Sequence, residues 1–301
     1  MYKQNFITRL FQKLLVNKDI RIFKKNFFYY VLFRLVRKFL NARVEIKIHN
    51  FKLSVSQKKN TTSHFLLKKC DFSEIAELEL IKRISDKNRI VFLDGGCNYG
   101  FFSFFVATLN KKNDVISVDA STKTCDEFRE NLRMNTLNNI TLMNNALSDK
   151  PYTNIKFYQA FNDWESSAIS SGFIEHNAFY IETITIDEIF KNRDLKEKKF
   201  IMKLDLEGFE IQAISGSRNV IKKYKPLIII ELSKYIIKNS EFDLIVLEKF
   251  LNEENYLICD LKGKIVNIKE IERLLNNLDE KHQTIGNFCL VYKSSNMLSY
   301  I

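Results

Sequence analysis

Apolar residues in the central part of the chain form short runs that alternate with segments of helical period. The short runs predict strands at residues 90–93, 115–118, 140–143, 200–204, 227–230, 256–259 and 288–292. Helical spacing of apolar positions predicts helices from residue 101, at 125–134, at 210–224 and at 242–251. Short strands that alternate with helices are typical of a parallel sheet with right-handed crossovers. The pattern therefore predicts an α/β, doubly wound domain.

Other patterns precede and interrupt this rhythm. Alternation of apolar and charged residues at 43–55 predicts a hairpin, and residues 72–84 predict a helix. Two strand-like pieces, 155–158 and 180–186, flank a polar loop that contains the only tryptophan, Trp164. That loop offers a stacking surface for a sugar ring. The alternative is a surface loop whose tryptophan packs against the sheet.

Positive charge is concentrated at the start of the chain. Residues 1–60 hold 15 Lys and Arg against two acids, whereas the rest of the chain is close to neutral. Apolar spacing within residues 6–40 also predicts two amphipathic helices. We therefore divide the chain into a basic helical and hairpin N-terminal extension (1–60) and a main domain (61–301). The basic faces are explained by solvated lysines on helices that pack on the main domain, or alternatively by peripheral membrane contact through residues 1–40.

The composition limits the class of protein and its partners. With 46% apolar residues, a chain of 301 residues can form a large core. Its five cysteines include no CxxC pair, which argues against a disulfide framework and a zinc site and favours a reducing, cytoplasmic compartment. No apolar run is long enough to span a bilayer, so any membrane association is expected to be peripheral. A nucleic-acid partner is not expected, because no aromatic-basic motif of a known reader is present.

A glycine-rich turn is the first candidate for a functional site. The stretch VFLDGGCNYGFFSFF, residues 91–105, places three of the chain's eight glycines between a predicted strand and a predicted helix. Such a turn lets a ligand approach the backbone and the free N–H groups of a helix N-terminus. A dinucleotide fingerprint, GxGxxG, would need glycine at position 97, which is cysteine. Counted from the acid, the motif is D-x-G-x-N-x-G over Asp94, Gly96, Asn98 and Gly100, and an acid at the strand end would repel a diphosphate.

This turn resembles the first motif of S-adenosylmethionine-dependent methyltransferases. In that class the first acid faces the aminoacyl end of the cofactor, and the loop backbone, here including Gly95, lies beneath it. The resemblance implies a second acid after the next strand to hold the ribose hydroxyls, and Asp119, followed by Ala120, stands there. The alternative role for Asp119 is a cap on the helix that follows. The resemblance places the adenine at Asn145 and Ala146.

A second group of acids lies in KLDLEGFE, residues 203–210. Asp205 ends a predicted strand and Glu207 follows two residues later, so both carboxylates are expected at the carboxyl end of a parallel strand. Open α/β sheets bind their ligands at that edge. This stretch is therefore expected to complete a site with the glycine turn.

Six separated motifs resemble the FkbM family of methyltransferases in order and spacing, over about residues 75–235. They are LDGGCNYGFFS, NALSD, ETITIDEI, KLDLEGFE, AISG and KPLIIIELS. The resemblance implies a class I methyltransferase (Rossmann-like) fold, with a mostly parallel seven-stranded sheet and helices on both faces. It also implies S-adenosylmethionine as cofactor and O-methylation of a hydroxyl on a sugar, glycan or related small molecule. Two departures are Cys97 in place of alanine, and Asp119-Ala120 in place of Glu-Pro.

On this hypothesis, the acids at the ends of the predicted strands take part in catalysis or in binding of the acceptor. Asp205 is the first candidate for the base or orienting group of the acceptor hydroxyl, and Glu207 is the second. Glu231, which ends the next predicted strand, is expected to line the acceptor site. Glu210 is interpreted as a first-turn acid favoured by the helix dipole. No metal is assigned, because hard carboxylate sites need more oxygen ligands than the sequence places.

Two other classes of function are compatible with parts of the sequence. An NAD-dependent sugar oxidoreductase would share the sheet and an acid for the ribose, but the GxGxxG turn is absent, and the only Tyr-x-x-x-Lys pair, Tyr152 and Lys156, runs into a strand-like piece. A non-catalytic membrane- or polyanion-binding protein would account for the basic residues 1–60. It would leave the acids of the two motifs without a role.

Overall fold

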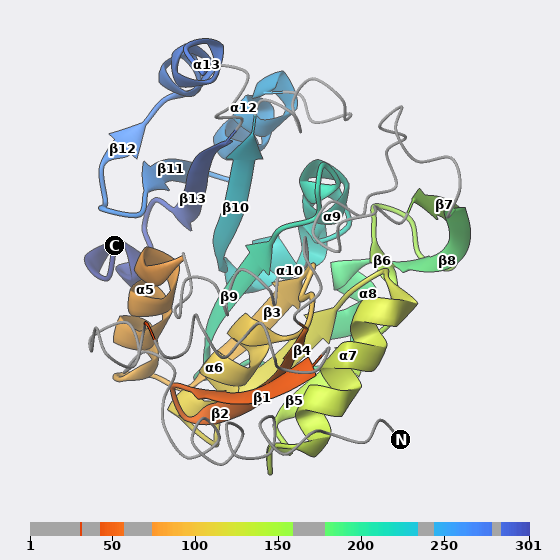
Figure 1. Ribbon diagram of the computed structural model, residues 1–301. Coiled ribbons are helices and arrows are strands. Elements are labelled where there is room, and N and C mark those ends of the chain that lie inside the picture. The colour runs from red at the N-terminus through yellow and green to blue at the C-terminus, as the bar shows by residue number, and fades with distance from the viewer. Residues whose placement is uncertain (1–30, 32–42, 57–73, 159–177, 234–243, 279–283) are drawn as a thin grey trace.

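The computed structural model describes residue 31 and residues 43–56, 74–158, 178–233, 244–278 and 284–301. The main strands are β3 Ile90–Gly95, β4 Asp114–Val118, β5 Ile140–Met143, β9 Lys199–Leu204, β10 Leu227–Ser233, β11 Tyr256–Asp260, β12 Ile265–Val266 and β13 Thr284–Tyr292. They form one twisted sheet in the order β5-β4-β3-β9-β10-β13-β11-β12 (Figure 1). Strands β5, β4, β3, β9 and β10 pair in parallel, whereas β13 is antiparallel to β10 and β11. The seven predicted strands are all present, and the two-residue β12 adds an eighth at the edge.

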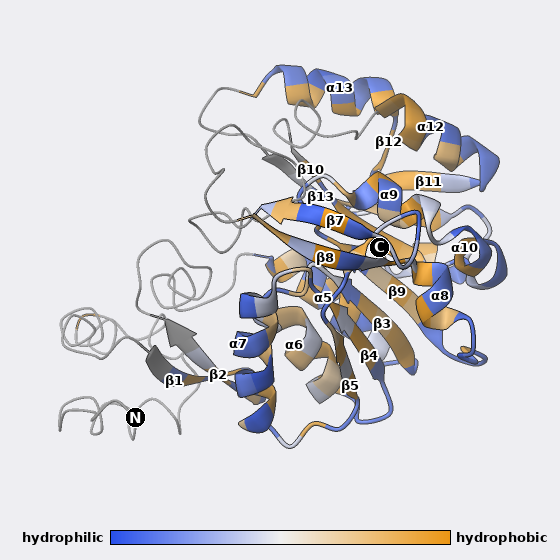
Figure 2. Ribbon diagram, turned by 90° about the vertical axis from the view of Figure 1, so that its right-hand side faces the viewer, coloured by the Kyte–Doolittle hydropathy of each residue, from blue (hydrophilic) through white to orange (hydrophobic). Residues whose placement is uncertain are grey.

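Helices cover both faces of this sheet. One face carries α5 Ile75–Ser85, α6 Phe101–Leu109 and α7 Thr122–Arg133. The other carries α8 Ile186–Phe190, α9 Glu210–Ser215, α10 Arg218–Tyr224, α12 Leu244–Glu253 and α13 Ile268–Asn276. Successive strand residues point to opposite faces, so in β3 Ile90 and Phe92 join the first apolar cluster while Val91 and Leu93 join the second. The strands are accordingly apolar along their length, whereas α7 is largely hydrophilic on its outer side (Figure 2).

The predicted hairpin at 43–55 is confirmed as strands β1 Arg43–Ile48 and β2 Phe51–Ser56, which pair antiparallel. Its residues Ile46, Ile48, Phe51 and Leu53 are buried in the same apolar cluster as α6. Hydrogen bonds from the backbone N–H groups of Lys52 and Ser54 to side-chain oxygens of α7 and the turn after it also attach the hairpin. The hairpin therefore belongs to the packed core of the first face. The predicted helices within residues 6–40 and the proposed boundary at residue 60 lie outside the described residues.

A smaller sheet lies beside the main one. It consists of β6 Ala146–Leu147, β8 Ala178–Ile184 and β7 Asn154–Tyr158, in the order β6-β8-β7 (Figure 1). It contains the two predicted strand-like pieces that interrupt the main rhythm. The loop around Trp164 between β7 and β8 lies outside the described residues.

The single helix predicted at 210–224 is wrong, because the structure divides it into α9 and α10 at Gly216 and Ser217. A Cβ atom on Gly216 would lie 2.1 Å from the backbone oxygen of Ser148, so only glycine fits against β6 at this point. The backbone oxygen of Gly216 accepts a hydrogen bond from the N–H of Asp187 in α8. A 3-10 turn, Asn296–Ser299, ends the fold, and no helix among the described residues is long and apolar enough to cross a membrane.

Candidate active site

The carboxyl ends of β3, β4, β9 and β10 surround a cavity of about 660 Å³. Ten of the residues predicted for the site line it, namely Asp94, Gly96, Asn98, Asp119, Ala120, Asn145, Ala146, Asp205, Glu207 and Glu231. Gly95 and Gly100 belong to the same turn but do not line the cavity. The two motifs, separated by more than 100 residues in sequence, thus meet at one edge of the sheet, as expected for parallel strands.

The glycine turn packs directly against the second motif. Gly96 has φ 75°, and a Cβ atom on it would lie 1.9 Å from the backbone oxygen of Asp205. Only glycine combines this left-handed conformation with such a close approach of two backbones. Gly100 has φ 95°, and a Cβ there would lie 2.5 Å from the ring of Phe104. These two glycines are therefore required by contacts within the protein, whatever ligand the turn binds.

Asp119 follows β4 and is held by backbone N–H groups. One of its carboxylate oxygens accepts from the N–H of Asn98, at 2.9 Å, and the other from the N–H of Ser121, at 2.8 Å. Burial raises the pKa of Asp119 to about 6, although both backbone hydrogen bonds lower it. The N-cap of α7 is Ser121, whose side chain accepts from the N–H of Thr124, so the alternative that Asp119 caps this helix is wrong. Asp119 instead ties the far end of the glycine turn to β4 and presents its carboxylate to the cavity.

Asp94 lies at the start of the same turn, in a more enclosed position. It accepts a hydrogen bond from the hydroxyl of Ser103 on α6, and that hydroxyl also contacts the hydroxyl of Ser117, at 2.7 Å. Asp94 is 2% exposed, and burial raises its pKa to about 6 while Lys203 and Ser103 lower it. The first acid of the motif is thus held by Ser103 on α6, whose hydroxyl is in turn held by Ser117 on β4.

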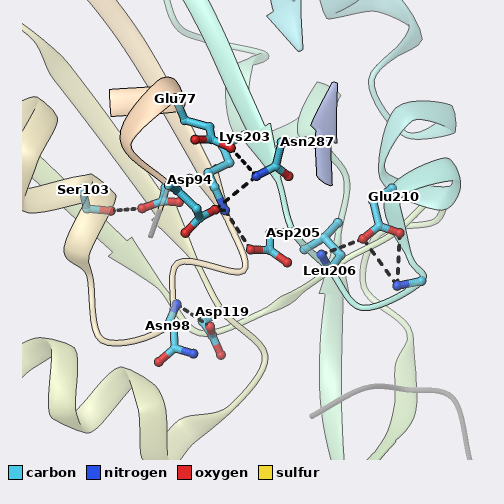
Figure 3. A network of polar contacts seen from close by, with 12 residues as sticks. Glu77, Asp94, Asn98, Ser103, Asp119, Lys203, Asp205, Leu206, Glu210 and Asn287 are labelled. Carbon is cyan, nitrogen blue, oxygen red and sulfur yellow. Dashed lines mark hydrogen bonds and ion pairs between the residues drawn. The ribbon is translucent and has the colours of Figure 1, made fainter. Parts of the chain in front are cut away.

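A buried lysine connects the acids at this end of the cavity (Figure 3). Lys203 on β9 is 3% exposed, and its Nζ lies 2.7 Å from Oδ2 of Asp205 and 3.5 Å from Oε1 of Glu74. Asn287 on β13 donates to Oε1 of Glu77, at 2.6 Å, and to Oε1 of Glu74, at 3.3 Å. All of these side chains line the cavity. Lys203 and Asn287 therefore hold three carboxylates together. These are Glu77 on α5, Glu74 at the N-cap of α5 and Asp205 after β9.

Sequence interpretation missed Lys203, Glu74, Glu77, Asn287 and Tyr99 as cavity residues. A charged residue inside the otherwise apolar strand KFIMKL was the signal that could have identified Lys203, because an unpaired lysine is almost never fully buried. Glu74, Glu77 and Asn287 have no comparable local signal, because α5 and β13 reach the cavity from distant parts of the chain. Tyr99 lies within the glycine turn itself, and that position was the signal that could have identified it.

Glu210 is part of the second motif but has a different position. Its carboxylate accepts from the backbone N–H of Leu206, at 2.8 Å, and of Gly208, at 3.1 Å (Figure 3). Glu210 is fully buried, and burial raises its pKa to about 7 although those backbone hydrogen bonds lower it. It does not line the cavity. Glu210 therefore braces the turn after β9, in addition to occupying the first turn of α9 as predicted.

The opposite side of the cavity is less charged. Ala120 and Ala146 line it together with Ile155 and Phe157 of β7, and Ala146 is 5% exposed. The side-chain amide of Asn145 donates to the backbone oxygen of Glu182 on β8, at 3.3 Å. This side has the small and apolar residues that a flat heterocycle requires.

Among the residues that the structure describes, no group of three or more His, Cys, Asp and Glu side chains is arranged to hold a metal ion.

Comparison with known proteins places the chain in a family. The family model described as "Methyltransferase FkbM domain" matches residues 94–258, more than half of the chain. No curated protein matches the chain.

Solved structures also match the chain, at low sequence identity. The methyltransferase FkbM from Methylobacillus flagellatus KT is 17% identical with a TM-score of 0.41, and the match covers 75% of this chain but only 52% of that one. The SAM-dependent methyltransferase from Agrobacterium tumefaciens is 10% identical, with a TM-score of 0.45 and coverage of 84% and 71%. M. jannaschii TYW2, solved in complex with AdoMet, is 11% identical, with a TM-score of 0.38 and coverage of 83% and 86%.

The family match spans the glycine turn, Asp119 and the KLDLEGFE turn, which are the elements that meet in the cavity. The strand order of the main sheet, with the reversed strand β13 between β10 and β11, agrees with the predicted class I fold. The chain therefore belongs to the FkbM family of methyltransferases.

Proposed function

We propose that this protein is an S-adenosylmethionine-dependent O-methyltransferase that acts on a hydroxyl of a sugar, glycan or related small molecule. The observation that carries the proposal is the shared cavity. It joins the glycine turn and Asp119 to the carboxylates of Asp205, Glu207 and Glu231. A donor and an acceptor can therefore be bound side by side at the carboxyl edge of the sheet.

The residues around Asp119 fit the nucleoside part of the donor. Each oxygen of its carboxylate accepts one backbone hydrogen bond, and a carboxylate oxygen has about two acceptor sites, so acceptor capacity is left for a ribose diol. Ala120 and Ala146 leave room for the adenine next to it, with the apolar residues of β7 opposite. When bound, S-adenosylmethionine supplies an electrophilic methyl group on its sulfonium.

The residues at the ends of β9 and β10 fit the acceptor. Asp205 is held at 2.7 Å by Lys203, which fixes the direction of its carboxylate, and its side chain is 29% exposed. A carboxylate in this position can accept the hydrogen bond of an acceptor hydroxyl and take its proton. Glu207 and Glu231 add further acceptors on the same wall, which suits a ligand with several hydroxyl groups. Positioning of that hydroxyl supplies much of the expected rate enhancement.

Calorimetry of the purified protein with S-adenosylhomocysteine and with NAD tests the class of cofactor. We expect S-adenosylhomocysteine to bind and NAD to show no heat of binding. Binding of NAD alone would establish the oxidoreductase alternative, and binding of neither would favour a non-catalytic protein. A screen of neutral sugars, nucleotide sugars and surface glycans with a radiolabelled methyl donor then identifies the acceptor, and transfer to a protein or nucleic acid instead would contradict the proposed acceptor class.

We further propose a cytoplasmic location and, for residues 1–40, a role in packing or in peripheral membrane contact. Free, buried thiols support a reducing compartment, because Cys97, Cys125, Cys259 and Cys289 are all unpaired and buried. Sedimentation of the full chain with anionic vesicles, compared with a chain whose basic residues in 1–40 are replaced by glutamine, tests the membrane alternative. Equal sedimentation of both chains would exclude it.

A further inference from the structure

The cavity has an uneven distribution of charge. Among its described lining residues, seven carry a carboxylate, whereas Lys203 is the only Lys, Arg or His. Lys203 also lies beside the start of the glycine turn, since it is the register partner of Asp94 between β9 and β3. Asp119, by contrast, holds the end of that turn through the N–H of Asn98. A ligand that extends along the turn from Asp119 therefore ends near Lys203.

Lys203 has donor capacity left for such a ligand. An ammonium group has three donors, and the carboxylates of Asp205 and Glu74 account for two of them. The ring of Phe102 lies 4.7 Å from Nζ and covers another side of the group. Burial opposes its charge, but Asp205, Glu74 and Asp94 raise the pKa of Lys203 well above its usual value. The lysine is therefore a fixed positive charge at the base of the cavity.

Tyr99 provides a second, independent indication of a ligand. It belongs to the glycine turn, lines the cavity and is only 3% exposed. Its hydroxyl is buried and has no hydrogen-bond partner in the part of the chain that the structure describes. A buried hydroxyl without a partner is costly and uncommon in native proteins. Burial, and then the charge of Glu74, raise the pKa of Tyr99, so the hydroxyl stays protonated and can donate.

We propose that Lys203 and Tyr99 bind the carboxylate at the amino-acid end of the methyl donor. This inference rests on the proposed function, because it assigns the far end of the same cofactor. That end is a zwitterion, and its carboxylate would be repelled by the acids that line the cavity. Its favourable position is at Lys203, the one cation among the described lining residues, with the Tyr99 hydroxyl as a second donor. The ammonium group of the donor is then left to the carboxylates of Asp94 and Glu74, while Asp205 serves the acceptor.

Two ligands that differ only in this carboxylate test the proposal. S-adenosylhomocysteine carries it, and S-adenosyl-3-thiopropylamine, its decarboxylated analogue, retains the ammonium group. Their Kd values are measured by calorimetry for the full chain and for Lys203→Met, Tyr99→Phe and Lys199→Met. Lys199 is the matched control, because it lies on the same strand but contacts Asn296 outside the cavity.

We expect Lys203→Met to raise the Kd of S-adenosylhomocysteine about 10- to 100-fold, as for loss of a charge-assisted hydrogen bond. Tyr99→Phe should raise it about 5-fold, as for a neutral donor. The Kd of the amine analogue should stay within about threefold in both variants, or fall in Lys203→Met because a like charge is removed. Lys199→Met should leave both ligands unchanged.

Equal weakening of both ligands by Lys203→Met would mean that the lysine only maintains the shape of the cavity, and would overturn the inference. Unchanged affinity for S-adenosylhomocysteine in both cavity variants would overturn it as well. If Lys203→Met does not fold, Tyr99→Phe decides by the same two ligands, since it keeps the aromatic ring. Failure of the unaltered protein to bind either ligand would instead contradict the proposed function.

Discussion

Two turns of the active site are each held by a carboxylate that accepts hydrogen bonds from backbone N–H groups, but only one of these carboxylates reaches the cavity. In the glycine turn, the carboxylate of Asp119 accepts from the backbone N–H of Asn98. In the turn after β9, the carboxylate of Glu210 accepts from the backbone N–H groups of Leu206 and Gly208. Glu210 is fully buried and Asp119 is half-buried, and burial raises the pKa of Asp119 to about 6 and that of Glu210 to about 7. Asp119 lines the cavity and Glu210 does not.

The two acids show which property separates a ligand-binding carboxylate from a structural one. Both acids lie in motifs that resemble those of methyltransferases, and both stabilise a tight turn through backbone N–H groups. A perturbed pKa therefore fails to distinguish them, since buried structural carboxylates are perturbed as strongly as functional ones. Contact with the cavity is the property that assigns Asp119 to a ligand and Glu210 to the scaffold. Substitutions in and between the two turns test that assignment.

The largest effect is expected at the carboxylate that lies between the two turns. Asp205→Asn should lower turnover about 10²- to 10⁴-fold, because the amide cannot accept the proton of the acceptor hydroxyl. The amide oxygen can still accept from Lys203, so the Kd of S-adenosylhomocysteine should change less than about threefold. The measurements are kcat with the acceptor found by the screen, and Kd by calorimetry. A large loss of cofactor binding with unchanged kcat would transfer Asp205 to the donor site.

Separating the two turns should cost stability. Gly96→Ala places a methyl group against the backbone oxygen of Asp205, and we expect it to lower the free energy of unfolding by about 3–5 kcal/mol. Gly286→Ala is the control, because Gly286 also has a positive φ, 102°, but its Cβ would have no atom within 4 Å. The free energy of unfolding of that variant should fall by only about 1–2 kcal/mol, because the new side chain strains the left-handed backbone. Equal losses in urea unfolding would show that conformation, and not the contact between turns, is what requires Gly96.

Glu210→Gln should alter the pH dependence of stability and leave binding unchanged. The pKa of Glu210 in the folded state is about 7, above its ordinary value of 4.5, so the folded state binds the proton more tightly. Glu210 therefore contributes about 3 kcal/mol to the free energy of unfolding, for a shift of this size, at pH values below 4.5. This contribution is lost as the pH rises through 7. The free energy of unfolding of the variant should therefore fall less between pH 5 and pH 8 than that of the parent. Parallel curves, or weaker binding of S-adenosylhomocysteine, would contradict a purely structural role.

Asp119→Asn should have the converse effect. We expect the Kd of S-adenosylhomocysteine to rise about 10- to 30-fold, because a neutral amide is a weaker acceptor for the ribose diol than a carboxylate. The turn should persist with a small loss of stability, since the amide oxygen can still accept from the N–H of Asn98 while the hydrogen bond from the N–H of Ser121 is lost. Calorimetry measures the affinity, and thermal unfolding without ligand measures the turn. Unchanged affinity would assign Asp119 to the scaffold together with Glu210.

The parts of this site that sequence could predict are those that depend on neighbours in the chain. The strands, the glycine turn and the acids at strand ends are local patterns, and parallel strands necessarily bring their carboxyl ends to one edge. The cluster around Lys203 could not be predicted, because Glu74, Glu77 and Asn287 come from elements up to 213 residues apart. The break between α9 and α10 was missed for the same reason. Apolar periodicity continues across Gly216, and the contact that ends the helix is made by Ser148.

The β1–β2 hairpin has a practical consequence for producing this protein in shorter forms. Its buried residues cover α6, whose first turn directly follows the glycine turn. A recombinant chain that begins at residue 61 would keep every methyltransferase motif. It would leave the phenyl rings of Phe101 and Phe104 on α6 without their contacts to Phe51 of the hairpin. Such a fragment is expected to aggregate on expression, so trimming should stop before Arg43.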